Sequence, residues 1–297
     1  MWNFCLKIRK INCLVLFSLL FSPTSVHAQS ISSTDLSQGY LLKAGPLSFG
    51  GAFRALADTN AAILYNPAGL AQRKEIVAMG GDYLRNGLTE ANTFGVSIVD
   101  TNAIDFISVG LSYDRDMPTI GGIDATIQQI TLAVAHEFSP LFYLGASIKG
   151  YLTNIETVGG PDGVDMDVGL LVKPLPMVSL AFVAHNLAKG HDFEEFPFLL
   201  GFGAALDLRP HFRLSMDIVK DFKTPARNDL NAYFGSELRI VEGICFRGGF
   251  GLDKVRDNNF YSLGTAVAGP KIGLLFTFSQ HLNPTSETYA ASVEAYF

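Results

Sequence analysis

Along most of the chain after residue 73, apolar and polar residues alternate one for one. Residues 212–218 are an example, with Arg213 and Asp217 among the polar members and Leu214 and Met216 among the apolar ones. A period of two places successive side chains on opposite faces of a β-strand. The pattern therefore predicts strands that have one apolar face and one polar face.

Fourteen such segments follow one another, separated by turns of two kinds. The segments are residues 74–84, 91–99, 104–114, 124–138, 142–155, 163–173, 177–186, 197–208, 211–220, 230–240, 243–252, 258–268, 271–279 and 287–297. Tight turns fall at residues 100–103, 139–141, 174–176, 209–210, 241–242 and 269–270. They alternate with longer polar or Gly-rich links at residues 85–90, 115–123, 156–162, 187–196, 221–229, 253–257 and 280–286.

An even number of strands, with tight turns at one end and longer loops at the other, is the plan of an outer-membrane barrel. A soluble sandwich is the alternative, but its Greek-key connections give no reason to gather the long loops at one end. We therefore predict an all-β fold over residues 74–297, a transmembrane antiparallel up-and-down β-barrel of about 14 strands.

The charged residues of the strands fall on the polar side of the alternation. Arg or Lys on the lipid face of a barrel costs about 2–4 kcal/mol at the bilayer midplane, whereas a lumen position is hydrated. We therefore expect these side chains to line the lumen as ion pairs and hydrogen bonds. The expected lumen residues are Asp165, Asp167, Arg213, Asp217, Glu237, Arg239, Arg247 and Glu294.

The first 28 residues have the three parts of a secretory signal. A positive region with Lys7, Arg9 and Lys10 precedes the apolar residues 11–22, and Val26-His27-Ala28 is a small-residue cleavage site. Twelve apolar residues are fewer than the roughly 20 that a spanning helix needs. Residues 1–28 are therefore predicted to be a cleaved signal peptide rather than a buried helix, and the mature protein to be exported to the bacterial outer membrane.

Composition supports a membrane protein and argues against nucleic acid as a partner. Mean hydropathy is +0.25, yet the mature chain has no uncharged apolar run of about 18 residues that would predict a spanning helix. Lys and Arg total 22 against 28 Asp and Glu, and loss of three cations with the signal lowers the net charge from −6 to −9. Only Cys245 follows the signal, so an internal disulfide is excluded.

In residues 29–73, apolar and polar residues do not alternate with the period of two that predicts a strand. Turns at Gly45-Pro46 and Gly50-Gly51 lead to Asp58, which we expect to cap a helix over residues 59–65. Asn66 before Pro67 is expected to cap a second short helix, since proline suits the first helical turn. A compact, mostly uncharged segment of this kind cannot extend the barrel wall, so it is predicted to be a partly helical plug, or hatch, in the lumen.

Two stretches resemble known barrel families. Residues 49–58 and 61–70, with the plug motif Asn66, Pro67, Ala68 and Gly69, resemble the N-terminal signature of FadL-like and PorV/PorQ-like outer-membrane proteins. This resemblance implies a fourteen-stranded barrel with an N-terminal hatch. Residues 165–187 are more similar to the PorV/PorQ branch.

The resemblance implies two functions. FadL-like members pass long-chain fatty acids or other hydrophobic molecules, whereas PorV-like members hold or shuttle secreted proteins in type IX-like secretion. The outer loops are short compared with the FadL pattern, and the remnant of a capture groove is Phe193, Phe196 and Phe198, which could instead fold inward. The sequence favours passive transport of small hydrophobic, fatty-acid-like molecules through a hatch-plugged lumen, with a scaffold or shuttle for secreted proteins as the alternative.

The last strand resembles the recognition signal that barrel-insertion machinery reads. Tyr289, Val293 and the terminal Phe297 share one apolar face. Outer-membrane lipid and the insertion machinery are therefore expected partners.

No catalytic, cofactor or metal constellation is predicted. There is no Gly-x-Ser-x-Gly elbow, and His185 at a strand end is expected to be a solvated polar residue. Asp162, Asp165 and Asp167 do not match the spacing of a calcium loop. The sequence predicts a protein that is not an enzyme.

Overall fold

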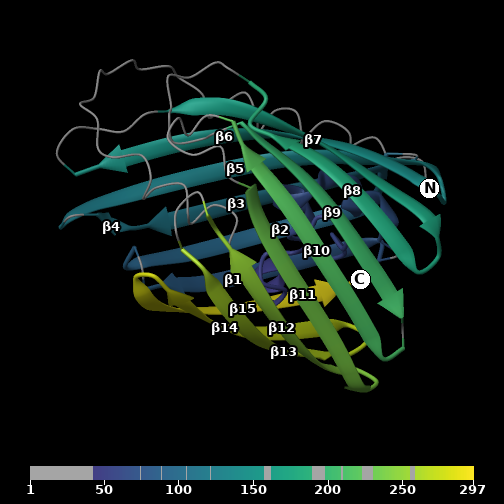
Figure 1. The fold of residues 1–297 in the computed structure, drawn as a ribbon. Helices are drawn as coiled ribbons and strands as arrows, with labels where there is room; N and C mark the ends of the chain where they lie inside the picture. Colours follow the sequence, from purple (N-terminus) through teal and green to yellow (C-terminus); the bar gives the residue numbers. More distant parts are fainter. Residues whose placement is uncertain are drawn as a thin grey trace.

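The computed structural model describes residues 43–73, 75–87, 89–104, 106–120, 122–156, 162–188, 198–208, 210–222, 230–254 and 258–297. These residues form one large antiparallel sheet around a small helical segment (Figure 1). The predicted signal peptide and residues 29–42 lie outside the described residues, so those predictions stay as stated.

The wall consists of strands of 8 to 17 residues and one two-residue strand. Their bounds are β1 Val77–Asn86, β2 Ala91–Ile104, β3 Ile107–Met117, β4 Thr119–Ile120, β5 Ile123–Ser139, β6 Phe142–Ile155, β7 Gly163–Leu175, β8 Val178–His185, β9 Leu199–Leu208, β10 Phe212–Asp221, β11 Leu230–Val241, β12 Ile244–Leu252, β13 Phe260–Ala268, β14 Ile272–Leu282 and β15 Thr285–Tyr296.

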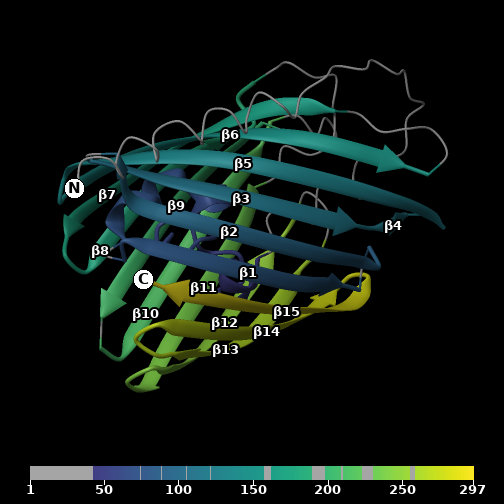
Figure 2. The ribbon, with the colours of Figure 1, turned by 180° about the vertical axis from the view of Figure 1, so that it is seen from behind.

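The sheet closes on itself. Strand β1 pairs with both β2 and β15, and β3 pairs with β5, so the ring needs no contribution from β4. Strand β4 only extends the outer end of β3 as a small hairpin with β5. The wall is therefore a closed barrel of fourteen antiparallel strands, which confirms the predicted fold class (Figures 1 and 2).

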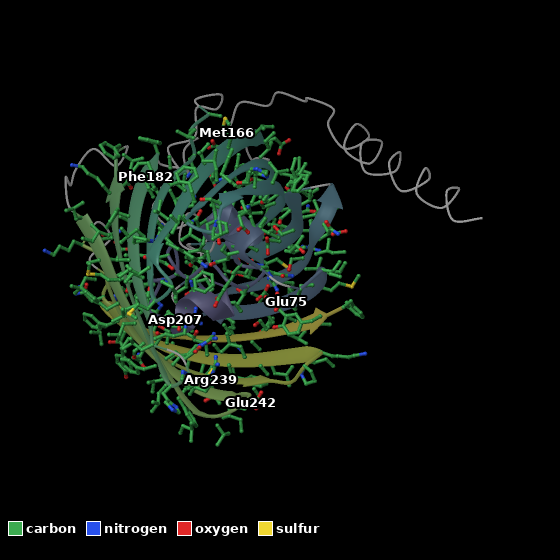
Figure 3. The ribbon with its side chains drawn as sticks, turned by 90° about the vertical axis from the view of Figure 1, so that its right-hand side faces the viewer. Glu75, Met166, Phe182, Asp207, Arg239 and Glu242 are labelled. Atoms are coloured by element: carbon green, nitrogen blue, oxygen red, sulfur yellow. The ribbon has the colours of Figure 1, made fainter. Side chains whose placement is uncertain are left out.

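The alternation of side chains separates two surfaces. Large apolar residues such as Phe94, Val96 and Phe276 are half exposed or more on the outside of the barrel, and Met166 and Phe182 lie on that outer side as well (Figure 3). Inward positions on the same strands are buried. A barrel of this kind presents its apolar band to lipid and its polar residues to the lumen.

Four predicted connections differ from the structure. The turn expected at residues 174–176 falls at residues 176–177, and the link expected at residues 115–123 contains the end of β3 and all of β4. In the other two connections the strands continue past their expected ends. The link expected at residues 280–286 is a tight turn of Asn283 and Pro284, because β14 and β15 stay paired as far as Leu282 and Thr285. Strand β2 runs on to Ile104, so its turn lies beyond residues 100–103. In both places backbone pairing continues through residues whose polarity suggested a loop.

Residues 43–73, hereafter the inner segment, lie inside the ring of strands (Figure 3). They contain helix α3 (Ala44–Ser48), helix α4 (Ala62–Tyr65) and the 3-10 helix η2 (Pro67–Gln72). Almost every residue from 43 to 70 is buried. No helix among the described residues is long and apolar enough to cross a membrane.

The helix boundaries partly match the expectations. Asn66 caps η2 as predicted, with its side chain accepting a hydrogen bond from the Ala68 N–H and Pro67 in the first turn. The predicted cap at Asp58 is wrong, because α4 begins only at Ala62 and the Asp58 carboxylate binds Arg213 instead. The turn expected at Gly45-Pro46 is also wrong, since both residues lie within α3.

Candidate functional site: the lumen and its inner segment

Glycines stand on the inward face of the wall where the inner segment comes closest. A Cβ on Gly145 would lie 2.4 Å from the Ala68 nitrogen, and one on Gly249 would lie 2.1 Å from the Gly50 nitrogen. Further inward glycines with the same property are Gly80, Gly110, Gly169, Gly201, Gly203, Gly235 and Gly264. We call these nine residues the glycine ring. They let the wall and the inner segment touch without intervening side chains.

The plug motif joins the C-terminal part of the inner segment to its middle and to the wall. The Asn66 amide donates to the carbonyl of Arg54 at 2.9 Å and to that of Leu170 on β7 at 3.4 Å. Gly69 packs against Ala57, where a Cβ would lie 2.3 Å from the carbonyl oxygen. The motif therefore fixes the fold of the segment by hydrogen bonds and close packing.

A buried aspartate of the wall holds the middle of the segment. The Asp217 carboxylate accepts hydrogen bonds from the backbone N–H groups of Phe53 and Arg54, both at 3.0 Å, and pairs with the Arg54 guanidinium at 3.2 Å. Both side chains of the pair are at most 3% exposed. A charge-assisted set of this kind is strong when all partners are present and costly to break.

Two more arginine pairs anchor the segment nearer the end of the barrel that holds its tight turns. Arg213 on β10 binds Asp58 at 2.6 Å, and Arg73 binds Glu294 on β15 at 3.3 Å. Glu294 also accepts the backbone N–H of Asn60 at 2.7 Å. The segment is thus tied to opposite sides of the wall.

Glu237 on β11 is the centre of a third group of charges. Its carboxylate lies 2.8 Å from Arg247, 3.5 Å from Arg239 and 3.8 Å from Arg213. The Arg247 guanidinium also lies over the Phe49 ring, 4.9 Å from its centroid, which is within the range of a cation–π contact.

The opposite end of the lumen has a different set of charges. Lys43, the first described residue, lies between Asp82 on β1 and Asp114 on β3, with its ammonium 3.3 Å from Asp82. Across the lumen, Asp167 binds Lys149 at 2.6 Å and lies 3.1 Å from the His185 ring nitrogen Nδ1.

Charges of the wall shift the pKa values of two groups in the inner segment. Burial opposes ionisation of Asp58, but the Arg213 and Arg247 guanidinium groups outweigh it and lower the pKa of that carboxyl. Burial would lower the pKa of Lys43, but the Asp114 and Asp82 carboxylates outweigh it and raise that pKa. Both groups are therefore charged at neutral pH.

All eight lumen residues expected from the sequence lie on inward strand positions. Asp165, Asp167 and Asp217 have no exposed surface, whereas Arg239 near the rim has 35% of its side chain exposed. Tyr289, Val293 and Phe297 are outward and exposed. The part that insertion machinery plays in reading these three residues remains a prediction.

The sequence reasoning missed the partners on the inner segment and the glycine ring. Lys43, Arg54 and Arg73 were not singled out, although each binds a wall carboxylate. The signal that could have revealed the ring is a glycine recurring at inward positions of successive strands. His185 corrects another expectation, because it is 2% exposed rather than solvated.

No metal or catalytic cluster emerges in the part of the chain that the structure describes. No three His, Cys, Asp or Glu side chains there could hold a metal ion. The aromatic loop expected at Phe193 and Phe196 lies outside the described residues, while Phe198 packs against Phe222 with ring centroids 5.5 Å apart.

Fold and lumen together define a class, a transmembrane β-barrel of fourteen strands whose lumen holds its own N-terminal segment. Among solved structures, the CymD monoaromatic hydrocarbon channel matches with a TM-score of 0.69 at 14% identity, over 86% of this chain and 97% of that one. The Ralstonia pickettii toluene transporter TbuX matches with a TM-score of 0.66 at 13% identity, over 86% and 98%.

A Pseudomonas aeruginosa FadL homologue matches with a TM-score of 0.61 at 11% identity, over 92% of this chain and 100% of that one. These likenesses show the fold and confirm the FadL-like architecture expected from the sequence. The similar structures are named as channels and transporters rather than as enzymes. No family model matches the chain, and no curated protein sequence does.

Proposed function

We propose that this protein resides in the bacterial outer membrane and lets small apolar molecules pass through its lumen without an energy source. One observation carries the proposal: the inner segment lies in the lumen, joined to the wall by close glycine contacts and five ion pairs, and is not part of the wall itself. Such a segment can shift while the hydrogen-bonded ring of strands stays closed.

The fold neighbours support the same function. CymD, TbuX and TodX are named for the passage of monoaromatic hydrocarbons or toluene, which are small, apolar and uncharged. We propose cargo of comparable size and polarity for this chain. No catalytic role, metal or cofactor forms part of the proposal.

The scaffold function rests on the resemblance at residues 165–187, and the structure gives these residues another use. They build β7, the turn at Pro176-Met177 and β8, and place Asp165 and Asp167 inside the lumen. The resemblance is therefore accounted for by barrel construction, and we favour transport over shuttling of secreted proteins.

Deleting residues 30–72 tests the proposal. Each strand of the wall pairs with two neighbours without help from the inner segment, so the deleted protein is expected to insert and to show heat-modifiable migration on a gel. In planar bilayers it should conduct ions, while the intact protein should not. Proteoliposomes with the intact protein should take up toluene faster than empty ones. Equal conductance of both proteins, or no gain in toluene uptake, would contradict the proposal.

A further inference from the structure

Apart from the mid-height pair of Arg54 and Asp217, the charges inside the lumen differ between its two ends. The chain ends of β1 and β15 and the tight turns mark the periplasmic end. Toward the opposite, outer end, the inward-facing charges in the described residues are seven aspartates and two lysines. These are Asp82, Asp114, Asp116, Asp165, Asp167, Asp221 and Asp253, with Lys43 and Lys149. A molecule that enters from outside therefore meets an acidic wall.

The acidic wall binds a cation in two places, and in one of them the cation belongs to the inner segment rather than to the wall. The Lys43 ammonium lies between the Asp82 and Asp114 carboxylates, and both acceptors belong to the wall while the ammonium belongs to the inner segment. Asp116, the next inward residue of β3, binds the Thr93 hydroxyl at 2.7 Å. The structure thus shows which chemistry this position accepts, a primary ammonium at the start of α3.

Two buried polar atoms beside the Lys43 ammonium have no hydrogen-bond partner. Ser112 precedes Asp114 on the inward face of β3, is 3% exposed, and its hydroxyl has no hydrogen-bond partner in the structure. The second carboxylate oxygen of Asp114 has none either. Buried polar atoms normally have partners, so these two atoms can accept hydrogen bonds from a ligand head group placed differently from the Lys43 ammonium.

From this we infer that the lumen selects its cargo by charge: it takes apolar molecules with a neutral or cationic head and rejects carboxylates. Asp82 and Asp114 form the head-group subsite, which Lys43 fills in this structure and which a cationic head takes by displacing Lys43. The inference rests on the proposed function and narrows its substrate class, because it excludes fatty-acid anions. The physical cause is that the aspartates strongly repel a carboxylate brought close to them in a narrow lumen, whereas a cationic head takes the place of the Lys43 ammonium.

Three probes with one aromatic ring test the inference: benzylammonium, benzyl alcohol and benzoate. Each is titrated at neutral pH into the full mature protein in lipid nanodiscs, with empty nanodiscs as the blank for partitioning into lipid. Benzylammonium and benzyl alcohol are expected to bind, and benzoate is expected to bind at least about tenfold more weakly than benzylammonium.

Variants test whether Asp82 and Asp114 cause the preference for benzylammonium over benzoate. Lys43→Met removes the competing ammonium and should tighten benzylammonium binding by about tenfold, with little effect on benzyl alcohol. The triple variant K43M/D82N/D114N removes all three charges together, so that none is left without its partner, and should reduce the preference for the cation over the anion severalfold, while the remaining aspartates of the wall keep a smaller preference. Asp100→Asn is the matched control, because Asp100 is a carboxylate on the periplasmic side of β2 outside the lumen, and it should leave all three affinities unchanged.

Each result has a defined meaning. If benzyl alcohol binds but benzoate and benzylammonium bind equally, the charge inference is wrong and the proposed function stands. If the triple variant keeps the full preference, the subsite is wrong. If none of the probes binds to protein that migrates as folded, the proposed function and the inference both fail. Heat modifiability of every variant verifies that the barrel has formed.

Discussion

The two halves of the lumen differ in the basic residues that face its carboxylates. In the periplasmic half and at the level of the inner segment, each of five arginines lies within 4 Å of a carboxylate: Arg54, Arg73, Arg213, Arg239 and Arg247. Among the described residues of the outer half, the inward-facing basic residues are two lysines among seven aspartates. Guanidinium groups bind carboxylates through fixed, forked geometry, whereas a lysine ammonium is a flexible point charge. We infer that the arginine pairs hold most of the inner segment, and that the outer half, where Lys43 alone of the segment's described residues is ion-paired, meets the proposed cargo.

The largest expected effect comes from the glycine ring. Gly249→Val places a branched side chain where a Cβ alone would lie 2.1 Å from the Gly50 backbone. Neither backbone can move far enough to relieve this clash. The inner segment should therefore be displaced from its position in the lumen, with a destabilisation of about 3 kcal/mol or more. We expect ion conductance in planar bilayers close to that of the deletion of residues 30–72.

The neighbouring glycine is the matched control for this substitution. A Cβ on Gly248 would have no atom closer than 3.8 Å, so Gly248→Val should leave the barrel closed to ions. Equal conductance of Gly249→Val and Gly248→Val would show that the glycine ring does not hold the inner segment in the lumen.

The buried pair of Arg54 and Asp217 should give the next largest effect. Asp217→Ala leaves the guanidinium and two backbone N–H groups without their acceptor, and breaking such a pair costs about 3–5 kcal/mol. We expect frequent channel openings in single-channel recordings and faster protease cleavage within residues 43–73. The double variant R54M/D217A should recover part of the loss, and no recovery would argue against the pair as the cause.

A carboxylate of the outer half should matter less for closure. Asp116→Asn keeps a hydrogen-bond acceptor for Thr93 and removes one negative charge from the acidic wall. A single hydrogen bond of this kind contributes about 1 kcal/mol, so thermal stability should change little and conductance should stay absent. Openings as frequent as in Asp217→Ala would remove the distinction between the two halves.

The smallest expected effect is a dependence of closure on acid. The pKa of Asp58 is lowered by Arg213 and Arg247, so its pair stabilises the seated segment above the ordinary carboxyl pKa of about 3.9. This stabilisation is lost as the pH falls through the lowered pKa. Conductance should therefore rise modestly in strong acid, and Asp58→Asn should remove that part of the rise. An unchanged rise in the variant would assign the acid response to other carboxyls.

The sequence by itself determined the wall. Alternation with a period of two assigned residues such as Leu214 to lipid and Arg213 to the lumen, because a slip of one residue would turn each charge toward the bilayer. The same reasoning predicted fourteen strands and, for β6, the bounds 142–155 that the structure shows. These features are local or depend on the bilayer, so one chain segment carries enough information to fix them.

Only the tertiary structure decided what the lumen residues do. Asp58 looked like a helix cap but lies 2.6 Å from an arginine 155 positions away, and Asp217 binds a segment 163 positions earlier. The glycine ring has meaning only where the inner segment passes. Contacts between distant residues depend on how the closed barrel arranges its walls around the segment, and a local pattern of residues does not contain that arrangement.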